Sequence, residues 1–260
     1  MSPKIVNQQS LQAREKELLD SALSIIEKSG VAGFNMDKLA ALVPYSKGTI
    51  YNHFSSKEDL LTGICCQGIA ILNGLFGKAT EFSGSTRDRV MAQHLAYLLY
   101  ALLYPNRFLL VLSAMSPALF ERASEQRRIE FQERENALLS SFLNVIAEAV
   151  ERGELTLPNH MSPKQVAFAN WSLGFGTIAL LAGDTNTCEC RRGLSIEHEL
   201  ISNANIMLDG LGWHPLSSEA DSTALIKNLL CDIFSEEIAV LESRGITLNL
   251  SDSGDTHGDL

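Results

Sequence analysis

The stretch from residue 34 to residue 61 constrains the fold of this chain more than any other, because it holds three helix-capping signals in about two dozen positions. Asn35 and Ser46 each precede a short run of helix-forming residues, and their side chains can accept hydrogen bonds from free backbone N–H groups. Ser55 followed by Glu58 has the spacing of a capping box. The signals predict three helices set at defined angles, over 36–42, over 47–54 and from about residue 56 onward.

The second of these helices has one apolar face and one polar face. Ile50 and Phe54 lie four residues apart, so they share the face that should pack against Leu39 and Val43 of the preceding helix. The remaining residues are Lys47, Gly48, Thr49, Tyr51, Asn52 and His53. A glycine lets a partner approach the backbone, and an amide can read a base. Lys57 opposes the dipole of the third helix, which suggests that an anion compensates it. The pattern favours a helix-turn-helix DNA reader over the simpler alternative of a solvated surface.

The sequence YSKGTIYNHFSSKEDLL, residues 45–61, resembles the TetR family of bacterial transcriptional regulators, and the likeness extends back to Gly30. Two positions depart from the family pattern: Pro44 replaces a turn glycine, and Asn35 replaces a capping threonine. By this resemblance Lys47, Tyr51, His53 and Lys57 would contact phosphates, while Thr49 and Asn52 would reach bases. The expected DNA-binding residues are Asn35, Lys47, Gly48, Thr49, Tyr51, Asn52, His53 and Lys57.

Charge is distributed unevenly along the chain. The formal charge is −10, yet residues 1–60 hold seven Lys/Arg and seven Asp/Glu, so the rest carries the whole excess. The protein should therefore bind defined DNA sites rather than coat nucleic acid. No apolar signal segment opens the chain, and five cysteines suggest no disulfide framework, so a cytoplasmic protein is expected. Pro105 divides the apolar run 95–115, which predicts buried core helices and no membrane partner.

Apolar residues recur at helical spacing along the rest of the chain, without a strand pattern. The expected fold class is therefore all-α. The resemblance to the TetR family implies an N-terminal three-helix helix-turn-helix head and a larger helical C-terminal domain for effector binding and dimerisation. Further helices are expected over 12–29, 56–82, 86–104, 107–114, 121–153, 163–182, 195–211 and 223–243. The first half of 121–153 should be solvated, with an ion pair between Glu130 and Arg134. The expected domains are 1–56 for DNA, 57–250 for ligand and dimer, and 251–260 as a disordered acidic tail.

Aromatic residues gather in the middle of the chain. At helical spacing they can be ordinary core, but the resemblance implies an effector cavity between these helices. The candidate ligand-binding residues are His94, Tyr97, Tyr100, Tyr104, Phe108, Met115, Trp171 and Phe175. A small apolar or aromatic molecule is the expected effector. Small residues in helix 163–182 make it a candidate dimer face.

Motifs of enzymes are missing from the sequence: it has no GxSxG, HExxH, phosphate loop or dinucleotide fingerprint, so no enzyme activity and no cofactor are expected. Cys188-x-Cys190 with His198 lacks a recognised zinc spacing, so no metal is expected. The sequence predicts a homodimeric regulator, and in the first instance a repressor, that binds palindromic double-stranded operator DNA and is released by a small-molecule effector. Two alternatives stay open. One is an activator, and the other is an architectural or adapter protein that recruits a partner protein without a small ligand.

Overall fold

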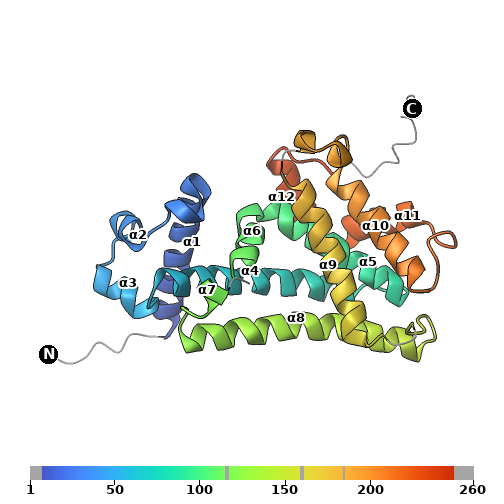
Figure 1. The fold of residues 1–260 in the computed structure, drawn as a ribbon, viewed down its shortest axis with the longest axis horizontal. Coiled ribbons are helices and arrows are strands. Elements are labelled where there is room, and N and C mark those ends of the chain that lie inside the picture. The colour runs from blue at the N-terminus through green and yellow to red at the C-terminus, as the bar shows by residue number, and fades with distance from the viewer. Residues whose placement is uncertain (1–7, 115–116, 159–160, 184, 249–260) are drawn as a thin grey trace. The chain divides into compact units, whose positions relative to one another are not determined.

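The computed structural model describes residues 8–248 apart from 115–116, 159–160 and 184, and every extended regular element in this part is a helix (Figure 1). The predicted all-α class is confirmed. The first half of the chain forms α1 (Gln8–Gly33), α2 (Met36–Leu42), α3 (Lys47–His53), α4 (Lys57–Thr80), α5 (Thr86–Leu103) and α6 (Pro105–Ala114). The second half forms α7 (Pro117–Phe120), α8 (Glu125–Glu151), α9 (Pro163–Leu181), α10 (Ile196–Gly210), α11 (Ser222–Asn228) and α12 (Ser235–Ser243).

The chain folds as two compact units. One combines Met1–Ala70 with Tyr104–Glu135, and the other combines Ile71–Leu103 with Asn136–Leu260. Helices α4 and α8 each contribute residues to both units. The first unit extends past the expected domain boundary at residue 56, because Leu110 of α6 and Phe131 of α8 belong to its hydrophobic core.

The core of the first unit is made by the apolar faces expected from the sequence. Helix α1 turns out of helical geometry at Gly30, whose φ of 69° suits glycine, so the predicted end of the first helix is confirmed. One buried cluster contains Leu18, Leu19, Ala22, Ile26, Leu39, Val43, Ile50 and Phe54. Cys65 and Cys66 of α4 join this cluster, and burial raises the pKa of each thiol to about 12. Both cysteines therefore act as unreactive apolar side chains.

The second unit is built around α5, against which α9, α10 and α12 pack. Trp213 is fully buried, and its indole Nε1 donates to Thr86 Oγ1 at 2.8 Å. Arg87 is also buried: it donates to the Trp213 carbonyl at 2.8 Å and lies 2.7 Å from Asp209 Oδ1. The buried guanidinium is thus paired and hydrogen-bonded, as a charge in a core must be.

Three predicted helix starts and one predicted continuous helix were wrong. Helix α1 begins at Gln8 instead of residue 12. Helix α6 begins at Pro105, where a proline suits the first helical position, and α8 begins at Glu125 instead of residue 121. The single helix expected over 223–243 is broken by a π-helical turn at Leu229–Ile233. Leu229 and Phe234 are both fully buried, and Phe234 N donates to Leu229 O at 3.0 Å. Residues five apart diverge on an α-helix but align in a π turn, which lets both side chains enter the core.

Among the described residues, α4 is the helix that is long and apolar enough to cross a membrane by length and composition. In the structure 61% of its most apolar window is buried, and the core helices of soluble proteins have the same property. The expected acidic tail, 251–260, lies outside the described residues.

Candidate nucleic-acid interface

The first two predicted helix caps are confirmed. Asn35 is extended, and its Oδ1 accepts from the backbone N of Lys38 at 2.8 Å at the start of α2. Ser46 is also extended, and its Oγ accepts from the backbone N of Thr49 at 3.1 Å at the start of α3. These caps fix where α3 begins, and so fix which of its residues face outward.

The third predicted cap, a box of Ser55 and Glu58, was wrong by one residue. Helix α4 begins at Lys57, and Ser56 Oγ accepts from the backbone N of Asp59 at 2.9 Å. Asp59 Oδ2 in turn accepts from Ser55 N at 2.9 Å and from Ser55 Oγ at 3.1 Å. The cap is therefore Ser56, and Asp59 reaches back to the residue before the cap instead of to the cap itself.

The outward face of α3 carries most of the predicted DNA-binding residues. Exposed positions are Lys47, Gly48, Tyr51 and Asn52, while Ile50 of the same helix is buried. Thr49 is half-buried, and its hydroxyl lies 2.9 Å from Ser46 Oγ. A Cβ added at Gly48 would meet only Ser46 Oγ at 3.8 Å, so this position leaves the backbone open to a partner. Ile50 and Phe54 face inward as the sequence predicted, whereas the side chain of His53, expected on the polar face, is mostly buried.

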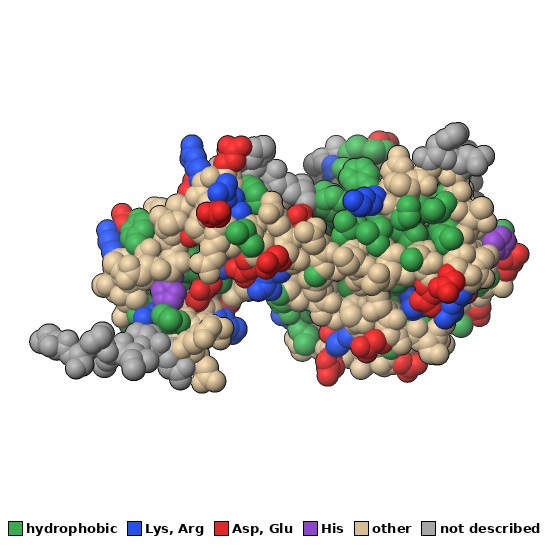
Figure 2. Space-filling model, turned by 90° about the horizontal axis from the view of Figure 1, so that it is seen from below, with side chains coloured by type: hydrophobic (Ala, Val, Ile, Leu, Met, Phe, Trp, Pro, Cys, Tyr) green, Lys and Arg blue, Asp and Glu red, His purple; other side chains and the backbone are tan. Residues whose placement is uncertain are grey.

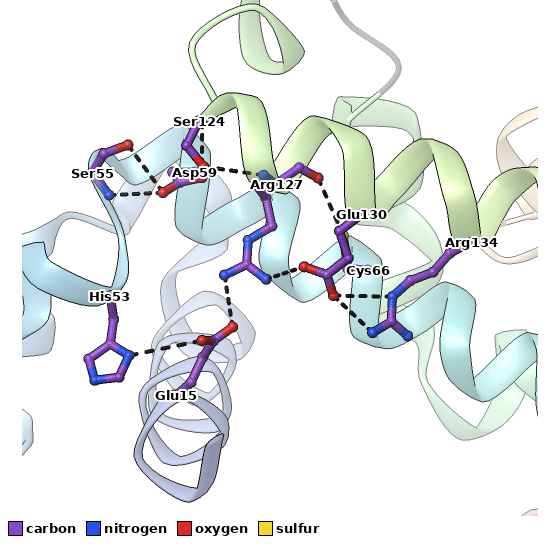
Figure 3. A network of polar contacts seen from close by, with 9 residues as sticks. All are labelled: Glu15, His53, Ser55, Asp59, Cys66, Ser124, Arg127, Glu130 and Arg134. Carbon is purple, nitrogen blue, oxygen red and sulfur yellow. Dashed lines mark hydrogen bonds and ion pairs between the residues drawn. The ribbon is translucent and has the colours of Figure 1, made fainter. Parts of the chain in front are cut away.

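Lys47 and His53 have different surroundings. Lys47 Nζ forms a surface ion pair with Asp37 Oδ1 of α2 at 2.7 Å, and the hydrogen bond that the lysine donates to this carboxylate raises the pKa of the lysine. The side chain of His53 is only 8% exposed, and its Nδ1 lies 3.9 Å from Glu15 Oε2 of α1 (Figure 3). The phosphate contact expected of each stays a prediction, and Lys47 is the more accessible of the two.

Lys57 has partners within the protein. Its Nζ donates to the carbonyls of Val31 at 3.0 Å and Phe34 at 2.7 Å, and it lies 5.7 Å from the centroid of the Phe34 ring. These carbonyls belong to the segment that ends α1, where unpaired acceptors are normal. They account for a lysine in the first turn of α4 without an anion, so the position of Lys57 by itself no longer points to one. A phosphate contact through its third N–H stays a prediction.

We expect Lys57→Met to lower the free energy of unfolding by about 1–2 kcal/mol, because two carbonyls lose a charged donor. Urea unfolding followed by circular dichroism measures the change. Lys47→Met is the matched control: its ion pair is exposed, so the unfolding midpoint should stay within error of the wild type. Equal midpoints for both variants would contradict the structural role of Lys57.

A polar network around Asp59 and Arg127 was missed by sequence reasoning (Figure 3). Asp59 is 2% exposed, and its Oδ1 accepts from Ser124 N at 3.1 Å and from Ser124 Oγ at 2.8 Å, just before α8. Burial alone would raise the pKa of Asp59, but the hydrogen bonds from Ser124 and Ser55 outweigh it and lower the pKa. The carboxylate is therefore charged and links the entry of α4 to the start of α8.

Arg127 forms the other half of this network. Its guanidinium lies 2.8 Å from Glu15 Oε1 of α1 and 2.6 Å from Glu130 Oε2, and its Cζ lies 5.5 Å from the centroid of the Phe54 ring. Its side chain is 11% exposed, so one face of the start of α8 is buried, while Glu125, Gln126, Gln132 and Glu133 are exposed as the sequence predicted. The predicted pair of Glu130 and Arg134 is present at 2.8 Å. Local sequence patterns could not reveal the network, since its members are up to 112 residues apart.

The expected effector residues do not all lie together. His94, Tyr97 and Tyr100 are buried on α5 in the second unit, and α9, which carries Trp171 and Phe175, packs against α5. The remaining candidates lie elsewhere: Tyr104 and Phe108 belong to the first unit, and Met115 is outside the described residues. The ligand-binding set stays a prediction.

Three of these residues have notable environments. Burial lowers the pKa of His94 to about 4, although Asn170 Oδ1 lies 3.2 Å from its Nε2. The imidazole is therefore neutral at physiological pH. Burial raises the pKa of Tyr97 to about 12, against the opposing hydrogen bond of Trp171. Trp171 itself is 41% exposed and contacts Phe168 edge to face, with ring centroids 6.1 Å apart.

Among the described residues, Cys188 and Cys190 of the loop over 183–193 do not belong to a group of side chains that could hold a metal ion. Cys188 Sγ and Cys190 Sγ lie 3.1 Å apart, while His198 Nδ1 lies 3.3 Å from Glu199 Oε1. Within that described part, no group of three or more His, Cys, Asp or Glu side chains could hold a metal ion.

Comparison with known proteins adds a sequence match and a fold match. Residues 18–64 match the family model described as bacterial regulatory proteins, tetR family. The chain is 22% identical over 144 residues to the fatty acid metabolism regulator protein of Bacillus subtilis (strain 168), which covers 54% of this chain and 69% of that protein.

Two solved structures share the fold. FadR from Bacillus subtilis in complex with stearoyl-CoA aligns with a TM-score of 0.55 and 14% identity, over 79% of this chain and 99% of that one. AibR in complex with isovaleryl coenzyme A and operator DNA aligns with a TM-score of 0.54 and 16% identity, over 74% of this chain and 97% of that one. Residues 18–64 thus carry the helix-turn-helix sequence of bacterial regulatory proteins of the tetR family, and the chain as a whole shares the fold of these solved structures.

Proposed function

We propose that the protein is a ligand-responsive transcriptional repressor that binds two-fold symmetric operator DNA through α3. The observation that carries this proposal is the outward face of α3, where Lys47, Gly48, Tyr51 and Asn52 are exposed above a buried Ile50. An exposed asparagine on a recognition helix can pair with adenine in the major groove, while Lys47 and Tyr51 suit phosphate oxygens. Because the head is electrically neutral, affinity should depend on the operator sequence and fall as salt rises.

The exposed aromatic face of α9 supports a homodimer. Phe168 is 63% exposed next to Trp171, and Ile206 of the adjoining α10 is 70% exposed. Figure 2 shows hydrophobic side chains on the visible surface of the second unit. Large apolar side chains grouped on the surface of one helix pair usually mark an interaction site. A second copy packed on α9 and α10 would cover them and present two heads to two half-sites.

The effector that the comparisons favour is an acyl thioester. The two aligned structures are regulators in complex with stearoyl-CoA and with isovaleryl coenzyme A, and the related Bacillus subtilis protein is a regulator of fatty acid metabolism. An apolar acyl chain also fits the expectation of a small apolar effector. The second unit offers the buried aromatic side chains of α5 to such a chain. Binding would release DNA to the extent that the effector favours one conformation over the other.

Fluorescence anisotropy with DNA taken from upstream of the protein's own gene tests this proposal. We expect specific binding that weakens with salt and is released by an acyl-CoA from a panel of chain lengths. Asn52→Ala should weaken binding about tenfold or more, because a base contact is lost. Asn136→Ala, an exposed asparagine of α8, is the matched control and should bind like the wild type.

Each outcome has a distinct meaning. Binding that Asn52→Ala leaves intact would contradict the assignment of α3 as the reading helix. Binding that no acyl-CoA releases would favour an adapter protein over a ligand-responsive regulator. Complexes that contain one protein copy per operator would contradict the homodimer.

A further inference from the structure

One buried side chain of the second unit lacks the partners that all comparable side chains have. The structure describes eight buried polar or charged residues: Asp59, Thr62, Thr86, Arg87, Gln93, His94, Arg107 and Asn170. Seven of them make at least one hydrogen bond within the protein. The exception is Gln93, which is 2% exposed and whose Oε1 and Nε2 both lack a partner among the described residues. Buried amides are rarely left this way, so the position requires an explanation.

Gln93 lies in a polar stripe along α5. Arg89, Gln93, Tyr97 and Tyr100 follow one another at spacings of four, four and three residues, which places them on one face of the helix. At the start of the stripe, Arg89 Nη2 lies 2.6 Å from Glu148 Oε1 of α8. Farther along, Tyr97 and Tyr100 are buried and mostly apolar in surface. The stripe therefore runs from a charged pair, through an amide, to aromatic rings.

We propose that the Gln93 carboxamide is the polar anchor of the effector site in the second unit. Its Nε2 would donate to the thioester or amide carbonyl of an acyl thioester, its Oε1 would accept an amide N–H, and the apolar chain would lie against the aromatic part of the stripe. This inference rests on the proposed function for the class of ligand. A ligand of this kind has one polar end and a long apolar end, which matches the order of side chains along α5.

The proposal has a consequence for the ligand-free protein. An amide kept without partners until a ligand arrives destabilises the fold, so its removal should stabilise the protein and abolish the response. Gln93→Met keeps the length of the side chain and removes both polar atoms. In the full-length protein without ligand, we expect this variant to raise the melting temperature by about 2–4 °C. Stearoyl-CoA and isovaleryl-CoA, used as probes, should bind it at least about tenfold more weakly than they bind the wild type.

Two control variants separate this role from a structural one. Asn170 is an equally buried amide of the same unit, but it donates to the Val166 carbonyl at 2.9 Å and contacts His94. Asn170→Leu should therefore lower the melting temperature, a change opposite in sign to that of Gln93→Met. Gln132 is exposed on α8, and Gln132→Met should change neither the melting temperature nor the binding of the probes.

Melting temperature with and without each probe decides between the outcomes. A more stable Gln93→Met protein that no longer gains stability from a probe supports the inference. A less stable Gln93→Met protein would show that the amide is satisfied in the fold and would overturn it, as would a variant that binds the probes like the wild type. A wild-type protein that neither probe stabilises would instead overturn the acyl thioester as effector class, and this inference with it, while operator binding through α3 would still be decided by Asn52→Ala.

Discussion

Replacing Asp59 with alanine should lower the free energy of unfolding of the first unit by about 3 kcal/mol. The carboxylate is almost fully buried and accepts hydrogen bonds from Ser55 N, Ser55 Oγ, Ser124 N and Ser124 Oγ. Alanine would leave these donors without their shared acceptor in a place that water reaches poorly. Amide hydrogen exchange of α2 and α3 measures the loss in this unit.

The chain supplies its own internal control for this experiment. Both tryptophans, Trp171 and Trp213, lie in the second unit, so their fluorescence reports on that unit alone. Asp37→Ala is the matched variant on the surface, and it should leave the exchange of both units unchanged. Equal protection of α2 and α3 in Asp59→Ala and in the wild type would contradict the role assigned to the buried carboxylate.

The buried Asp59 carboxylate should also make the stability of the first unit depend on pH. The pKa of Asp59 in the folded protein is lowered, whereas an aspartate in an unfolded chain titrates near 4. The stabilisation is therefore fully present well above pH 4 and is lost as the pH falls through the lowered folded pKa. Asp59→Asn, which cannot ionise, should remove this part of the acid dependence.

Replacing Arg127 with alanine should lower the free energy of unfolding about as much as Asp59→Ala does, and it should also weaken DNA binding. The side chain is mostly buried, pairs with Glu15 and Glu130, and lies over the Phe54 ring, so its loss should lower the free energy of unfolding by about 3 kcal/mol or more. Phe54 caps the C-terminal end of α3, and a loosened Phe54 would disturb the recognition face of this helix. Urea unfolding and fluorescence anisotropy measure the two effects.

Arg134→Ala is the matched control for Arg127→Ala. Arg134 pairs with the same Glu130 but is 36% exposed, so its replacement should cost about 1 kcal/mol at most and leave DNA binding intact. A double-mutant cycle of Arg127→Ala with Glu15→Ala isolates the contact between α8 and α1. A coupling energy near zero would show that Arg127 acts through packing rather than through this ion pair.

The sequence by itself determined the all-α class, the helix-turn-helix and the division of α3 into two faces. These follow from signals within a few residues of one another: Asn35 and Ser46 cap their helices through backbone groups three residues on, and Ile50 and Phe54 share a face because they are four apart. Local physics also explains the one-residue error at the third cap. Ser55 with Glu58 and Ser56 with Asp59 have the same spacing, and the structure uses the second pair, in which Asp59 also contacts the distant Ser124.

Tertiary structure alone decided what depends on residues far apart in the chain. Asp59 and Arg127 matter because α8 returns to the head after more than sixty residues, and no short spacing encodes that contact. The sequence also could not show that Lys57 donates to the carbonyls of Val31 and Phe34 at the end of α1. Nothing in the sequence marked Gln93 of α5 as special. A missing hydrogen bond can be recognised only when the positions of all neighbouring groups are known. Capping and periodicity are local and readable in sequence, whereas burial and hydrogen-bond satisfaction are properties of the assembled fold.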